Sequence, residues 1–197
     1  EAPAKDGFAT AARLSFGLWD SIPDQQLRDA AARNQLATVN QLRAQAERMV
    51  NDRRTRAKVR DFLFSWLRLD QGPEIVKDTT RFSEFSPEIA ADMRTSLELL
   101  LDDAVWGTTG GGGRPATRSD FRRLFLDDEV YVNGRLGPFY GVSMRPDTPF
   151  RRVRLDDGRR AGVLSHPYMA SVLSYAGSTS PIHRGVFLAR GVLGNVL

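Results

Sequence analysis

The sequence that decides the carboxyl-terminal fold is Ser178-Thr179-Ser180-Pro181-Ile182-His183-Arg184-Gly185-Val186-Phe187-Leu188-Ala189-Arg190. Ser180 is a favoured helix N-cap, and Pro181 suits the first helical position because its missing N–H needs no partner there. Apolar residues then follow one helical face, namely Ile182, Val186, Ala189 and Leu193. Gly194 stands where a left-handed residue would end the helix. We predict a terminal helix whose apolar face packs into the core formed by helices near 8–19 and 89–104.

Two glycines lie inside this predicted helix, and each costs about 1 kcal/mol relative to alanine. We therefore expect a neighbouring backbone to approach closely at Gly185 and at Gly191. Arg184 and Arg190 could each face an anion or pair with a carboxylate from elsewhere in the fold. The predicted structural or interaction residues are thus Ser180, Pro181, Arg184, Gly185 and Arg190. No catalytic, cofactor-binding or metal-binding residue is predicted.

The composition is that of an ordinary globular protein of 197 residues, with 41% hydrophobic and 26% charged residues. The absence of cysteine excludes disulfides, thiolate metal sites and covalent attachment of c-type haem to these residues. A net charge of +4 suggests an anionic partner, but the basic residues are dispersed and usually stand beside acidic ones. We expect solvated faces, no nucleic-acid partner and no direct membrane span.

Helix signals dominate the chain. Apolar periodicity and caps predict helices over about 8–19, 21–33, 38–50, 53–69, 86–106, 119–125 and 166–175, besides the terminal one. Three starts carry named caps: a capping-box pattern of Ser21 with Asp24, a second box of Thr38 with Gln41, and Ser86 followed by Pro87. Strand signals are confined to 150–163, where Val153 and Leu155 alternate with arginines before a hairpin signal at Asp157-Gly158. The predicted fold is mainly α, an irregular multi-helix bundle of seven to nine helices with one small β-ribbon near 150–163. The Gly-rich stretch 107–117 is predicted to be a flexible surface loop.

The histidines and the paired aspartates are the remaining candidates for chemistry, and we predict structural roles for them. His166 and His183 have no ligand partners at metal-binding spacing, so we expect both to be structural or exposed. The pairs Asp102-Asp103, Asp127-Asp128 and Asp156-Asp157 lack the calcium-loop pattern, and we assign them to helix ends and turns. A Ser-His-Asp triad stays possible, because its members need not be close in sequence.

Several stretches resemble domains of unknown function in planctomycete-type cytochrome c-associated proteins. The resemblance begins with Arg13-Leu14-Ser15-Phe16-Gly17-Leu18-Trp19-Asp20-Ser21-Ile22-Pro23-Asp24-Gln25-Gln26-Leu27 and continues through Glu47-Arg48-Met49, Asp61-Phe62, Trp66-Leu67, Tyr131-Val132-Asn133 and Phe139-Tyr140-Gly141-Val142. A second domain, which directly follows the first in such proteins, is resembled by 160–168 and by 179–185. We therefore expect a first domain over 1–145 and a smaller second domain over 146–197, packed on the first.

In such proteins a Cys-x-x-Cys-His haem site follows the region that resembles this chain. The resemblance implies a non-catalytic helical module of a larger exported cytochrome c-type protein, which positions haem domains or binds a partner protein. It implies an extracytoplasmic location, no cofactor in this segment and haem c elsewhere in the parent protein. Two alternatives stay open: a structural subunit of a membrane-associated electron-transfer assembly, or an enzyme acting on an exported substrate such as a polysaccharide.

Overall fold

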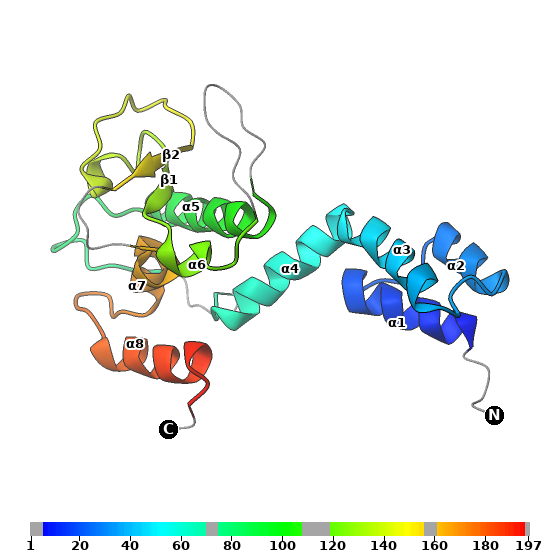
Figure 1. Ribbon diagram of the computed structural model, residues 1–197. Helices are drawn as coiled ribbons and strands as arrows, with labels where there is room; N and C mark the ends of the chain where they lie inside the picture. Colours follow the sequence, from blue (N-terminus) through cyan, green and yellow to red (C-terminus); the bar gives the residue numbers. More distant parts are fainter. Residues whose placement is uncertain (1–5, 70–74, 108–118, 156–160, 196–197) are drawn as a thin grey trace. The chain divides into compact units, whose positions relative to one another are not determined.

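The computed structural model describes residues 6–69, 75–107, 119–155 and 161–195. It confirms the predicted fold class, because 56% of the described residues are helical, and these residues form eight α-helices and one two-stranded antiparallel sheet (Figure 1). The chain forms two compact units, residues 1–64 and 65–197. The expected boundary between sequence domains near residue 145 stays a prediction. The loop predicted at 107–117 lies, after Gly107, outside the described residues.

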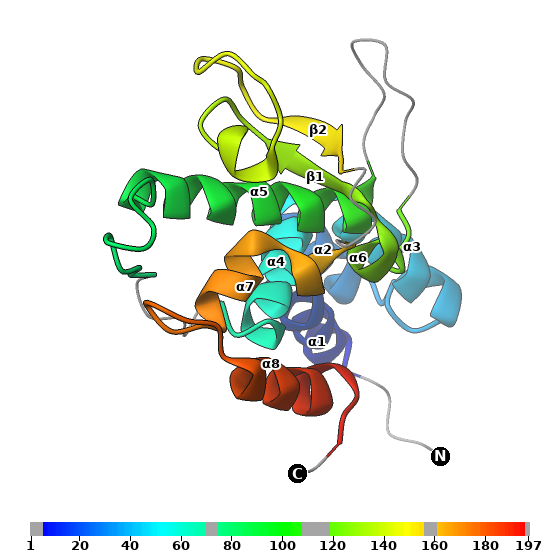
Figure 2. The ribbon, with the colours of Figure 1, turned by 90° about the vertical axis from the view of Figure 1, so that its left-hand side faces the viewer.

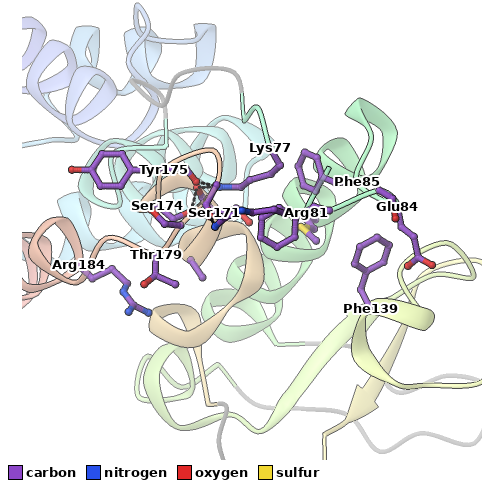
Figure 3. A pocket seen from close by; sticks show the side chains of 16 residues that line it. Lys77, Arg81, Glu84, Phe85, Phe139, Ser171, Ser174, Tyr175, Thr179 and Arg184 are labelled. Carbon is purple, nitrogen blue, oxygen red and sulfur yellow. Dashed lines mark hydrogen bonds between the residues drawn. The ribbon is translucent and has the colours of Figure 1, made fainter. Parts of the chain in front are cut away.

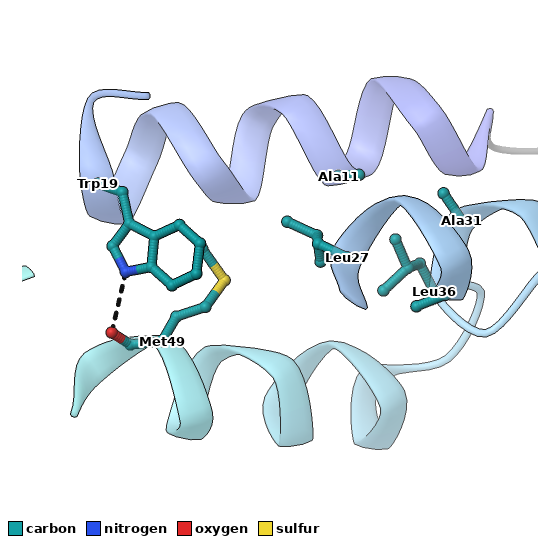
Figure 4. Packing of buried hydrophobic residues seen from close by; sticks show 7 residues of the cluster. Ala11, Trp19, Leu27, Ala31, Leu36 and Met49 are labelled. Carbon is teal, nitrogen blue, oxygen red and sulfur yellow. Dashed lines mark hydrogen bonds between the residues drawn. The ribbon is translucent and has the colours of Figure 1, made fainter. Parts of the chain in front are cut away.

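The first unit contains α1 (Gly7–Trp19), α2 (Gln25–Ala32), α3 (Val39–Val50) and most of α4 (Arg53–Trp66). Its core joins α1, α2 and α3 through Ala11, Trp19, Leu27, Ala30, Ala31, Leu36 and Met49 (Figure 4). The indole Nε1 of Trp19 donates a hydrogen bond of 3.0 Å to the Met49 carbonyl, which ties α1 to the end of α3. The guanidinium of Arg54 lies 3.3 Å from the centre of the Trp19 ring, a cation–π contact.

Of the two capping boxes predicted in this unit, only the one at the start of α3 is present. The capping box of Thr38 and Gln41 is present at the start of α3. Asp24, rather than Ser21, caps α2, where its carboxylate accepts from the Leu27 N–H at 2.9 Å. The same carboxylate is held by Arg48 at 2.8 Å, so one residue caps α2 and clamps it to α3. This ion pair connects two of the stretches that carry the resemblance, residues 13–27 and 47–49.

The second unit is built around α5 (Pro87–Trp106), whose start is capped by Ser86 as predicted. The ribbon lies on one side of α5 and α7 (Pro167–Val172) lies on the other (Figures 1 and 2). Shorter elements complete the unit: α6 (Arg123–Leu126), η1 (Pro138–Tyr140), η2 (Val163–Ser165), α8 (Pro181–Phe187) and the π-helical turn η3 (Leu188–Val192). Its largest fully buried side chains are Leu67, Leu97, Leu101, Leu124, Val132, Leu136, Val163, His166 and Met169.

The ribbon pairs β1 (Glu129–Val132) with β2 (Arg151–Arg154), in the register Glu129 to Arg154 and Val132 to Arg151. The sequence reading placed β2 correctly but missed its partner. The expected turn at Asp157-Gly158 lies outside the described residues. Strand β1 has only four residues and alternates half-buried with buried positions, a signal too short to separate from the turns that follow it.

The terminal helix is held differently from the prediction. Its predicted inner face is wrong, since Ile182 is 77% exposed and Leu193 is 64% exposed. The buried side chain is Phe187, and the Trp66 indole donates a hydrogen bond of 2.7 Å to the Gly191 carbonyl. The π-helical turn at 188–192 has more than 3.6 residues per turn. A face that is extrapolated from α8 at 3.6 residues per turn therefore no longer includes Leu193 reliably.

The two internal glycines differ in role. A Cβ on Gly191 would lie 3.2 Å from the Phe187 ring, which explains a small residue at this position, although the close neighbour is a side chain and not the backbone that was predicted. A Cβ on Gly185 would meet nothing within 4 Å, so the close approach predicted there is wrong. Gly194 has φ of 68°, and it ends the helix in the left-handed conformation as predicted.

Candidate functional site

A pocket of about 600 Å³ opens on the second unit (Figure 3). Its walls come from the segment 77–85, from α5 and η1, from the end of α7 with the following turn, and from α8. The apolar lining consists of Phe82, Phe85, Met93, Phe139, Ala170 and Tyr175. The charged lining consists of Lys77, Arg81, Glu84 and Arg184. The described part of the pocket therefore offers three cations and one carboxylate, where hydrolysis of a glycoside would require two carboxylates.

Lys77 anchors one wall of the pocket. Its Nζ lies 2.7 Å from the Ser174 Oγ and 3.1 Å from each of the Ser171 and Tyr175 carbonyl oxygens. Burial lowers the pKa of the Lys77 ammonium. A serine beside a lysine can be a nucleophile with its base, but only when the lysine nitrogen carries a lone pair. Here three acceptors use the three N–H groups of an ammonium, so Lys77 ties segment 77–85 to the end of α7.

A small turn after α7 also borders the pocket. Ser174 and Thr179 form an antiparallel bridge, and the Tyr175 N–H donates to the Ser178 carbonyl at 3.0 Å. Arg81 donates from Nη1 to the Gly177 carbonyl at 2.7 Å, which fixes the turn to segment 77–85. The side chains of Lys77 and Arg81 thus bind segment 77–85 to the segment that follows α7.

Of the five residues predicted from the terminal motif, only Arg184 lines the pocket. Ser180 is buried and caps α8 by accepting from the His183 N–H at 3.4 Å, and Pro181 is the exposed first residue of that helix. Gly185 is exposed on α8, and Arg190 lies in η3. The pocket residues of 77–85 were missed, because that segment has no regular periodicity or motif to mark it.

A family model described as a protein of unknown function, DUF1592 (PSD4), matches residues 6–142. The chain belongs to the DUF1592 family. The finding agrees at family level with the first of the two domains that the sequence resembles. No curated protein and no solved structure is significantly similar to this DUF1592 chain.

The buried histidine of the DUF1592 chain has a structural hydrogen-bond pattern. The Tyr168 N–H donates to Nδ1 of His166 at 3.2 Å, so Nε2 carries the proton of the neutral ring. Nε2 lies 3.1 Å from the Ser96 Oγ, and that hydroxyl donates to the Tyr131 carbonyl. A catalytic histidine would accept the serine proton, whereas here the proton points to the carbonyl of β1. This chain of hydrogen bonds through His166, Ser96 and Tyr131 therefore joins α7, α5 and β1.

Two of the acidic residues assigned to helix ends and turns belong to a buried charge network. Asp103 pairs with Arg123 at 2.9 Å and with Arg152 at 3.4 Å, and Arg123 also pairs with Asp127 at 2.7 Å. Arg152 further contacts Glu129 across the ribbon. The network connects α5, α6 and both strands, which is a structural role larger than the one predicted. Asp156 and Asp157 lie outside the described residues.

Within 6–69, 75–107, 119–155 and 161–195, no group of three or more His, Asp or Glu residues is placed to hold a metal ion. In the same ranges, no helix combines the length and hydropathy needed to cross a bilayer. The whole chain contains no cysteine.

Proposed function

We propose that this DUF1592 chain is a non-catalytic helical module of a larger exported cytochrome c-type protein, in which it binds the haem-bearing region. Family membership supports the first part of this proposal. The resemblance of 160–168 and 179–185 to the domain that precedes a haem site supports the second. Haem c would be attached outside this segment, which has no cysteine. The location would be extracytoplasmic, where c-type cytochromes of this class are assembled.

The observation that supports the proposal is the exposure of three apolar side chains in the terminal segment, Ile182, Leu188 and Leu193. These side chains are 77%, 40% and 64% exposed, although the helix itself is anchored by Phe187 and by the Trp66 hydrogen bond to Gly191. We infer that the partner covers these side chains together, because a contiguous exposed apolar patch is typical of an interaction surface. Covering them by a partner would remove apolar area from water, at about 25 cal/mol per Å².

Replacement of Ile182 by aspartate tests the proposal. Ile182 is in the first turn of α8, where a carboxylate is compatible with the helix dipole, so the fold should be unaffected. A carboxylate covered by a partner without a cation would cost about 1.4 kcal/mol or more, which is roughly a tenfold loss of affinity. The measurement is isothermal titration of the haem-bearing region of the parent protein into the chain, with melting temperatures recorded in parallel.

Val39→Asp is the matched control. Val39 is 74% exposed and also stands in the first turn of a helix, after the Thr38 cap, but it belongs to the first unit. We expect Val39→Asp to bind the haem-bearing region like the unsubstituted chain. Equal affinities for Ile182→Asp and Val39→Asp, or no binding by the unsubstituted chain, would refute the proposal.

A further inference from the structure

We infer that the pocket of the second unit is a binding site for a small organic anion with an aromatic or other apolar body, such as an aromatic carboxylate. The inference concerns a ligand of this chain itself and is independent of the haem-bearing partner. The distribution of charged groups and aromatic rings in the pocket supports this inference. Its volume of about 600 Å³ lies within the range of small-molecule sites, about 300–1,000 Å³.

The cationic groups differ in what they can still bind. Lys77 has all three N–H groups engaged, so it contributes charge but no further hydrogen bond. Arg81 uses one N–H for the Gly177 carbonyl. The Arg184 guanidinium forms no ion pair or hydrogen bond with any residue that the structure describes, although it lines the pocket. A planar guanidinium with free N–H donors is the group best suited to bind a carboxylate through two hydrogen bonds.

The pocket is polarised along its length. Figure 3 shows Arg184 and Thr179 at one end, and Glu84 with Phe85 and Phe139 at the other. An anion placed near Glu84 would be repelled, whereas one placed near Arg184 would be attracted. The apolar body of the ligand would then lie against Phe85 and Phe139. This arrangement selects a ligand with its charge at one end, and it disfavours a small inorganic anion, which would leave the aromatic wall uncovered.

The test uses two fluorescent probes that share an aromatic body and differ in charge. One is 8-anilinonaphthalene-1-sulfonate, and the other is N-phenyl-1-naphthylamine, which lacks the sulfonate. We expect saturable binding of the anionic probe to the complete chain, weakened by added salt. Arg184→Gln should weaken the anionic probe about fivefold, the effect of one charge-assisted hydrogen bond of about 1 kcal/mol at a partly exposed site, and leave the neutral probe unchanged.

Two further variants and a competitor complete the design. Phe139→Ala should weaken both probes, because it removes part of the apolar wall. Arg145→Gln removes the same charge from an exposed arginine outside the pocket and should change neither probe. 2-Naphthoate should displace the anionic probe at a lower concentration than 2-naphthamide does. Melting temperatures of all variants show whether each chain is folded.

Three results would overturn the inference. The first is absence of saturable binding of the anionic probe by the folded chain. The second is an affinity for the anionic probe that Arg184→Gln leaves unchanged. The third is equal weakening of both probes by Arg184→Gln, which would indicate a general disturbance of the pocket. None of these results bears on the Ile182 experiment, because Ile182 does not line the pocket.

Discussion

Asp103→Ala is expected to lower the free energy of unfolding by about 3 kcal/mol. The Asp103 side chain is 2% exposed and stands between the guanidinium groups of Arg123 and Arg152. Its removal leaves two largely buried cations sharing the remaining carboxylates, Asp127 and Glu129. Breaking a buried ion pair by removing one partner costs about 3–5 kcal/mol, and the remaining carboxylates place the expected loss at the lower end.

The measurement is the urea dependence of the circular dichroism of the folded chain, with Asp147→Ala as the matched control. Asp147 pairs with Arg145 in a contact whose side chains are 84% and 71% exposed, so its loss should cost less than about 1 kcal/mol. If Asp103→Ala unfolded within about 1 kcal/mol of the parent chain, the charge network would not hold α5 to the ribbon and α6.

Acidification from pH 7 to pH 5 is expected to destabilise the chain by about 2 kcal/mol through His166 alone. Burial lowers the pKa of His166 to about 3, whereas the ordinary value in an unfolded chain is 6.5. Between these two values the unfolded chain binds the additional proton, so stability falls as the pH falls through 6.5. Each unit below 6.5 costs about 1.4 kcal/mol, and the loss continues toward pH 3.

His166→Gln should remove this dependence between pH 7 and pH 5, because glutamine does not titrate. The measurement is the slope of the unfolding free energy against pH, which separates the titration from any constant cost of the substitution. His183→Gln, at the exposed histidine of α8, should keep the slope. A slope that survives in His166→Gln would contradict a neutral, buried His166.

Local signals in the sequence predicted most of the helices. The Ser86-Pro87 start of α5, the Thr38 and Gln41 box of α3 and the left-handed Gly194 all appear where the pattern placed them. Each of these signals depends on residues within one helical turn, so it can be read without knowing the tertiary structure. Such signals do not show which of two candidate caps is used. Asp24, and not Ser21, caps α2, and Asp24 also pairs with Arg48, which lies 24 positions further along the chain.

The candidate site was largely invisible to sequence reading, for a physical reason. The pocket brings together residues 77–85, 139, 170–179 and 184, which no local pattern connects. Asp103 could be read only as one half of an acidic pair, because its partners Arg123 and Arg152 are 20 and 49 positions away. The exposure of Ile182 was likewise unpredictable, since apolar periodicity marks a face without showing what covers it.

Amide hydrogen exchange in the presence of the haem-bearing region of the parent protein tests the central claim most directly. With that region at saturating concentration, we predict that the amides of residues 182–193 exchange at least about tenfold more slowly than in the chain alone, because the partner covers the terminal helix. The amides of α2, Gln25–Ala32 in the first unit, should exchange at an unchanged rate. A complex that leaves exchange at 182–193 unchanged, or the absence of any complex, would contradict the account.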